Sequence, residues 1–113
     1  MVYLNKVNER IVIITFNREI RLTGKKSVEL KECFKKSKVD NFETIIVDCQ
    51  NIVFIDSMGI ASIISMYKNI SSSGKRMILS GLRKEVKEIL TLLKLDKLFT
   101  IDDRTPDEIV EEI

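Results

Sequence analysis

The stretch from Ile45 to Tyr67 decides the fold, and it reads Ile-Ile-Val-Asp-Cys-Gln-Asn-Ile-Val-Phe-Ile-Asp-Ser-Met-Gly-Ile-Ala-Ser-Ile-Ile-Ser-Met-Tyr. Its first residues, 45–49, are almost continuously apolar, which is typical of a central strand covered on both faces. From Ser57 to about Ser71 the apolar residues recur every three or four positions, which indicates an amphipathic helix. The stretch therefore predicts a buried strand, a short connection ending in Asp56-Ser57-Met58-Gly59, and a helix.

Strands and helices alternate in the rest of the chain. The β-branched residues at 2–7 and 11–16 predict two strands joined as a hairpin, whereas residues 17–22 are polar and indicate irregular structure. The other predicted elements are a helix to about Lys38, a strand around Met77–Leu79, a helix after Gly81-Leu82, a strand at 98–101 and a short helix with Thr105 as its N-cap, Pro106 at its first position and Glu108 closing a capping box. The order β-β-α-β-α-β-α-β-α predicts an α/β fold, with a mixed sheet of about five strands and about four helices, in one domain spanning residues 1–113.

The composition limits the classes of function. Of 113 residues, 44% are hydrophobic and 32% are charged, which is typical of a globular domain, and the net charge of +2 gives no strong signal for a polyanion partner. The most basic segment runs from Arg18 to Lys38, but Phe34 is its only aromatic residue and follows the buried stripe of the predicted helix. We interpret these lysines as a solvated helix face and expect no direct contact with nucleic acid. Because the first residues lack a signal-peptide pattern and no apolar run is long enough to span a membrane, we expect a cytoplasmic protein, with a monomer as the default state.

The residue types that perform catalysis are scarce. The chain has no histidine, so a serine nucleophile lacks its commonest base, and neither a Gly-x-Ser-x-Gly elbow nor a glycine-rich phosphate loop occurs. The two cysteines, Cys33 and Cys49, lie in apolar segments, and we interpret them as buried reduced thiols. We therefore expect no enzyme activity, no cofactor and no metal site.

Ser57 is the candidate site, because it lies where a helix is predicted to begin. The N-terminus of a helix presents unpaired N–H groups and a partial positive charge, so a phosphoryl group on Ser57 would be stabilised there. The alternative is that Asp56 or Ser57 only caps the helix, and the residues alone favour this capping role.

The segment Ile45–Ile60 resembles the signature of STAS domains (sulfate transporter and anti-sigma factor antagonist). It is most similar to the free-standing bacterial anti-sigma factor antagonists, in which an apolar strand, a polar turn and a second apolar run precede Asp-Ser-(Ser/Thr)-Gly-(Leu/Ile). The resemblance covers nearly the whole chain and continues through Tyr67-Lys68, Gly74-Lys75-Arg76-Met77 and Leu92-Leu93-Lys94-Leu95.

The resemblance implies a partner switch. In such proteins the unphosphorylated antagonist binds an anti-sigma factor that is also a serine kinase, and thereby frees a sigma factor. The kinase then phosphorylates the serine that follows the aspartate, which here is Ser57, and a PP2C-type phosphatase reverses the modification. The implied partner-binding residues are Asp56, Ser57, Met58, Gly59, Ile60 and Arg21. Gly59 is expected to let the start of the helix approach the sheet closely.

Two residues depart from the family pattern. Met58 stands where the family often has Ser or Thr, and Arg21 stands where a carboxylate is common. If Arg21 lies near Ser57, its guanidinium can pair with a phosphate instead of repelling it. Two alternatives remain open beside the switch: an unphosphorylated STAS adaptor in a transporter or signalling scaffold, and a module that binds a small molecule or nucleotide.

Overall fold

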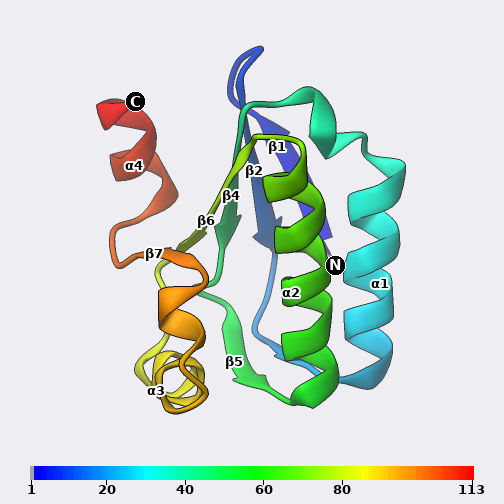
Figure 1. The fold of residues 1–113 in the computed structure, drawn as a ribbon, viewed down its shortest axis with the longest axis vertical. Coiled ribbons are helices and arrows are strands. Elements are labelled where there is room, and N and C mark those ends of the chain that lie inside the picture. Colours follow the sequence, from blue (N-terminus) through cyan, green and yellow to red (C-terminus); the bar gives the residue numbers. More distant parts are fainter. Residues whose placement is uncertain (1) are drawn as a thin grey trace.

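A five-stranded mixed sheet forms the centre of the computed structural model, which describes residues 2–113 (Figure 1). Its strands are β1 (Val2–Lys6), β2 (Ile11–Phe16), β4 (Thr44–Asp48), β6 (Arg76–Ser80) and β7 (Thr100–Asp102), and they lie side by side in this order. β1 pairs with β2 as an antiparallel hairpin, and every later neighbour pairs in parallel. The predicted mixed sheet of five strands is thus confirmed.

The helices cover the sheet in a way that follows from the strand order. α1 (Gly24–Lys36), α2 (Ser57–Ser72) and α3 (Lys84–Leu92) each connect one parallel strand to the next, and the sheet grows in a single direction from β2 to β7. Right-handed crossovers that advance in one direction place their helices on the same face. The chain then returns as α4 (Pro106–Glu112), where Ile109 packs in a separate apolar cluster with isoleucines of β2, β4 and β6.

The continuous apolar character of β2 and β4 reflects this arrangement. Along β2, Val12 and Ile14 belong to the large core cluster with residues of α1 and α2, whereas Ile11 and Ile13 belong to the cluster under α4. Successive side chains of a strand point to opposite faces, so a strand covered on both faces needs apolar residues at every position.

A second, two-stranded parallel sheet was not predicted. It consists of β3 (Ile20–Leu22) and β5 (Ile52–Ile55), so the prediction that residues 17–22 are irregular is wrong for the last three of them, and the connection before Asp56 is itself a strand. Three residues are too few to show a period-two pattern, and the strand forms only because its partner, more than 30 positions away, supplies the hydrogen bonds. Asn51 fastens this small sheet to the main one, since its Nδ2 donates to the carbonyl oxygen of Phe16 at 2.6 Å.

Smaller expectations have mixed outcomes. The capping box of α4 is confirmed, because Thr105 Oγ1 accepts from the amide of Glu108 while the Glu108 carboxylate accepts from the amide of Thr105. Both cysteines are free thiols, but only Cys49 is buried. Cys33 is half-exposed, with its sulfur 3.9 Å from the hydroxyl of Ser37, so its predicted burial is wrong.

Two 3₁₀ turns, Val39–Asn41 and Leu95–Lys97, follow α1 and α3. Within residues 2–113, none of the helices has the length and apolar character needed to cross a bilayer.

Candidate functional site

The site lies where β5 ends and α2 begins. Asp56 has extended backbone dihedrals, and its Oδ1 accepts a hydrogen bond from the amide of Gly59 at 2.9 Å. This is the geometry of an N-cap, in which a side-chain oxygen satisfies an amide of the first turn. The capping role that the sequence left open between two residues therefore belongs to Asp56, and this leaves Ser57 without that task.

Ser57 is the first residue of α2 and is exposed. Its hydroxyl forms no hydrogen bond with any other described residue. The Asp56 carboxylate accepts a hydrogen bond from the Gly59 amide, and the Asp56 carbonyl accepts one from the Ile60 amide. The amides of Ser57 and Met58 have no acceptor within residues 2–113. Two free N–H groups at the positive end of a 16-residue helix make a favourable position for an anion carried on the Ser57 side chain.

Gly59 is buried because the start of α2 presses against the small sheet. A Cβ atom at this position would clash with the carbonyl oxygen of Leu22 in β3 and would lie 2.7 Å from Cγ1 of Ile55 in β5. The amide of Asp56 also donates to the Leu22 oxygen at 3.4 Å. The expected close approach is therefore present, and β3 fixes the position of the helix start.

Exposed apolar side chains surround Ser57. Met58 is 52% exposed, and Phe54, three positions before Ser57, is also exposed. The guanidinium carbon of Arg21 lies 4.2 Å from the centre of the Phe54 ring, because the two residues are paired across β3 and β5. Among the described residues, Arg21 makes no hydrogen bond or ion pair with Ser57 or Asp56. Ile60, by contrast, is half-buried and packs against the core, so its contribution to a partner surface is small.

The family model described as "STAS domain" matches residues 3–108 of this chain. The chain belongs to the STAS domain family. A Thermotoga maritima protein provisionally named an anti-sigma factor antagonist is 30% identical to this STAS domain in an alignment 113 positions long, which covers 96% of the present chain and 94% of the relative. The crystal structure of a T. maritima protein provisionally given the same name, tm1081, matches 99% of this chain and 93% of that one with a TM-score of 0.75 and 29% identity. The Bacillus cell fate determinant SpoIIAA in its phosphorylated form has a TM-score of 0.74 at 16% identity, covers 99% of this chain and 98% of its own, and thus shares the fold.

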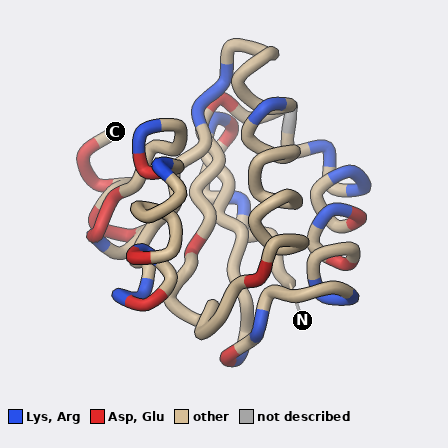
Figure 2. Tube along the Cα trace, turned by 60° about the horizontal axis from the view of Figure 1, so that its bottom comes forward, with Lys and Arg blue, Asp and Glu red and all other residues tan. Residues whose placement is uncertain are grey.

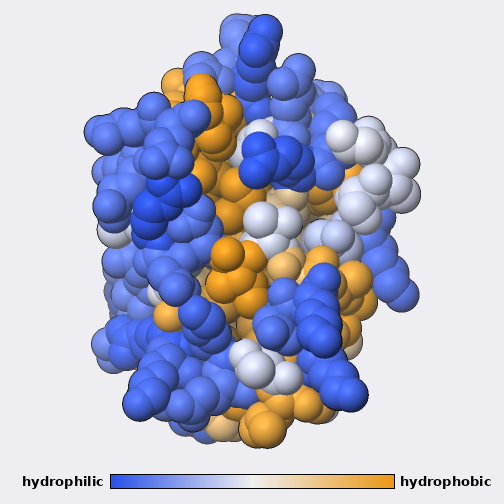
Figure 3. Space-filling view, turned by 60° about the vertical axis from the view of Figure 1, so that its left-hand side comes forward, coloured by the Kyte–Doolittle hydropathy of each residue, from blue (hydrophilic) through white to orange (hydrophobic). Residues whose placement is uncertain are grey.

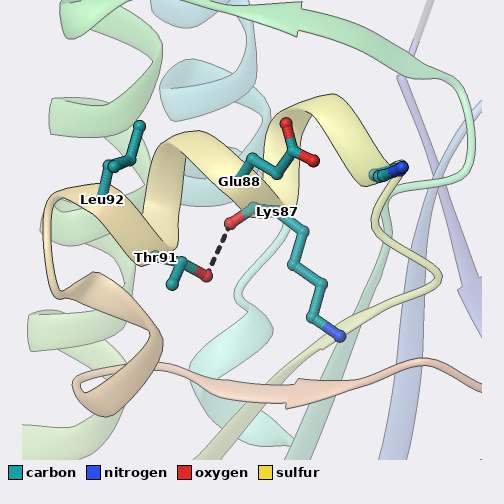
Figure 4. A pocket seen from close by; sticks show the side chains of 5 residues that line it. Lys87, Glu88, Thr91 and Leu92 are labelled. Carbon is teal, nitrogen blue, oxygen red and sulfur yellow. Dashed lines mark hydrogen bonds between the residues drawn. The ribbon is translucent and has the colours of Figure 1, made fainter.

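A hollow on α3 of this STAS domain does not include Ser57 in its lining. It has a volume of about 490 Å³ and is lined by Lys84, Lys87, Glu88, Thr91 and Leu92, all on α3 (Figure 4). Lys87 and Glu88 point apart, and the Lys87 ammonium group donates to Asp103 at 2.9 Å, so the polar groups do not converge on one ligand. This arrangement does not favour the small-molecule alternative. Among the described residues, no group of three or more His, Cys, Asp or Glu side chains is placed to hold a metal ion.

The side of the molecule that carries α3 and α4 also exposes apolar atoms between hydrophilic side chains (Figure 3). Leu92, at the end of α3, is 82% exposed, and Leu93, Leu98 and Ile113 are exposed as well. These side chains are dispersed over three segments of the chain. Nothing in the structure indicates which partner would bind to these side chains.

Sequence reasoning missed three residues that build the site. Leu22 supplies the carbonyl oxygen against which Gly59 packs, Phe54 holds the Arg21 guanidinium, and Asn51 anchors β5 to β2. The sequence placed Asn51 only in a polar turn. The one signal in the sequence was the position of Asn51 directly before the apolar run at 52–55. An amide side chain at the start of a strand can hydrogen-bond to nearby backbone.

Proposed function

We propose that this STAS domain is an anti-sigma factor antagonist that binds an anti-sigma factor serine kinase and is released when the kinase phosphorylates Ser57. The observation that carries the proposal is the division of labour at the start of α2. Asp56 caps the helix, so the Ser57 hydroxyl is exposed and has no partner within residues 2–113. A kinase can therefore reach Ser57 without breaking any contact that holds the domain together.

The surroundings of Ser57 support a switch that acts by charge. A phosphoryl group adds roughly two negative charges and three acceptor oxygens. The free amides of Ser57 and Met58 can receive some of these oxygens, so the modified domain stays folded. The same charge would be placed beside the Asp56 carboxylate and the exposed Met58 side chain, on a surface that has to lose water to bind a partner. Binding is therefore weakened while the fold is kept.

Arg21 belongs to the same surface through its pairing with Phe54. In the unphosphorylated protein, the aromatic ring positions the guanidinium, and the flat pair offers a partner both apolar area and a positive charge. We include Arg21 among the partner-binding residues for this reason. The relatives support the proposal, because they are provisionally named anti-sigma factor antagonists. A PP2C-type phosphatase would remove the phosphoryl group from Ser57 and so restore binding. The chain itself performs no chemistry in this scheme.

The test is phosphorylation by a cognate anti-sigma factor serine kinase. The purified protein is incubated with this kinase and ATP, and its intact mass is measured. We expect the addition of one phosphoryl group, its loss in Ser57→Ala, and its retention in the control Ser71→Ala, which changes an exposed serine at the other end of α2. Ser57→Asp should lose binding to the kinase. An unchanged mass together with intact binding of Ser57→Asp would instead favour the adaptor function.

A further inference from the structure

Helices α1 and α2 run side by side with their N-terminal ends at the same end of the molecule (Figure 1). Three adjoining hollows follow the line between them, with volumes of about 170, 20 and 160 Å³. The first hollow is bounded by Val28 and Met58, the second shares Lys31 with it, and the third shares Lys35 and Asn69 with the second. We call this line of hollows the α1–α2 groove. It begins at Met58, directly beside Ser57, and continues along both helices.

The charged residues that line the groove are all positive. They are Lys31 and Lys35, and neither ammonium group makes an ion pair with another described residue. α1 has two acidic residues: Glu29 lines a different hollow and pairs with Lys26 at 3.4 Å, and Glu32 is exposed but lines none of the three hollows of the groove. α2 adds no acid at all, since its only charged residue is Lys68. Figure 2 shows the same contrast between the strongly coloured α1 and the almost uncharged α2.

The end of the groove nearest to Ser57 is apolar at its rim and polar beneath. Val28 and Met58 are both about half exposed, on opposite sides of the first hollow. The same hollow is lined by Ser27, which is only 2% exposed and whose hydroxyl has no hydrogen-bond partner in the described chain. A buried hydroxyl that the protein leaves unpaired is costly, and a partner that brings a polar atom to it recovers part of that cost.

We propose that the α1–α2 groove docks an acidic amphipathic helix of a protein partner. Lys31 and Lys35 are four positions apart, as are the small residues Ala61 and Ser65 that leave the groove open on α2. On the α1 side, the lining residues advance from Val28 and Lys31 to Lys35 and Val39. A groove that advances along a helix in this way suits apolar side chains at positions i, i+4 and i+7 of an incoming helix. Carboxylates flanking those side chains would pair with the two lysines.

The groove and Ser57 form one continuous surface, because Met58 borders both. We therefore assign the docked helix to the partner that is released by phosphorylation, and this step rests on the proposed function. The kinase would hold the domain through the groove while its catalytic centre reaches Ser57.

The first experiment tests the groove without any native partner. Isotope-labelled protein is titrated with a capped synthetic helix that has leucine once per turn and glutamate beside it, and amide shifts are followed by NMR. We expect saturable shifts confined to residues 27–35 and 58–69. The double variant Lys31→Glu, Lys35→Glu should weaken binding at least about tenfold, and replacing the peptide glutamates by lysines should restore binding to that variant. Ala61→Arg, which fills the first hollow, should weaken binding to a similar extent.

The control is the double variant Lys84→Glu, Lys97→Glu, which makes the same change in net charge on exposed residues outside the groove. The control should bind as the wild type does. The inference is overturned if no saturable shifts occur at about 1 mM peptide, if the shifts lie on another face, or if the control loses as much affinity as the groove variant.

The kinase assay separates this inference from the proposed function. If the peptide binds the groove but the kinase does not modify wild-type Ser57, the groove is a docking site and the proposed function fails. If Ser57 is modified but the peptide does not bind, the switch stands and the groove inference fails. If both hold, Lys31→Glu, Lys35→Glu should slow modification of Ser57 at low protein concentration and not at saturation.

Discussion

Gly59→Ala tests whether the small β3–β5 sheet fixes the start of α2. The new methyl group would meet the Leu22 carbonyl oxygen and would lie 2.7 Å from Cγ1 of Ile55. The carbonyl belongs to a backbone that is held by the ladder between β3 and β5, so it cannot move aside as a flexible side chain would. Overpacking of this kind costs about 1–3 kcal/mol, and contact with backbone places the cost at the upper end.

The opposing effect is the better helix propensity of alanine, worth about 1 kcal/mol. The net loss of unfolding free energy should therefore be about 2 kcal/mol, which corresponds to a fall in melting temperature of about 8 °C for a domain of this size. Chemical denaturation followed by circular dichroism measures it. The same variant should slow phosphorylation of Ser57, because α2 has to begin at a different distance from β3.

Gly74→Ala is the matched control for this variant. Gly74 has a φ of +74°, and a methyl group added there would have no neighbour within 4 Å. Only the left-handed backbone therefore opposes the change, at a cost of about 1 kcal/mol. Gly74 lies far along the chain from Ser57, so its replacement should leave phosphorylation unchanged. A Gly59→Ala protein as stable as the wild type would refute the reasoning, since it would show that the helix start has room against β3.

Individual contacts give three further predictions. Asp56→Ala removes the side chain that accepts a first-turn amide and should lower the unfolding free energy by about 1 kcal/mol, measured by urea denaturation; an unchanged midpoint would contradict the assigned cap. In the native protein, Cys33 should react readily with a thiol reagent, whereas Cys49 should not. Burial is the main cause that raises the pKa of the Cys49 thiol, and the nearby Asp48 charge adds to it. Equal reaction rates of the two cysteines, measured by mass spectrometry, would be inconsistent with this burial. Hydrogen bonds from Arg104 lower the pKa of Asp102 to about 2, so the pair stabilises the fold above about pH 4, and this contribution is lost as the pH falls toward 2. Asp102→Asn should remove that part of the acid dependence, by less than about 1 kcal/mol because the pair is solvent-accessible, and an acid titration of stability identical to the wild type would argue against it.

The sequence by itself determined the main sheet and the order of its elements. The nearly continuous apolar runs at 11–16 and 45–47 are typical of strands covered on both faces, and the periodic apolar residues after Ser57 are typical of an amphipathic helix. Local chemistry also sufficed for α4, because the capping box needs only residues three positions apart. These features are encoded within a few residues of one another, so they can be recovered from the chain alone.

The tertiary structure alone decided how Ser57 is presented. Only the folded chain shows that Asp56 takes the cap, that a strand of three residues pairs with β5, and that the Arg21 guanidinium rests on Phe54. The cap is a local contact, but the sequence offered both Asp56 and Ser57 for it. The other two contacts join residues far apart in the chain, so packing chooses the partner. The α1–α2 groove arises in the same way, since its lysines and small residues come from two helices that become neighbours only when both pack on one face of the sheet.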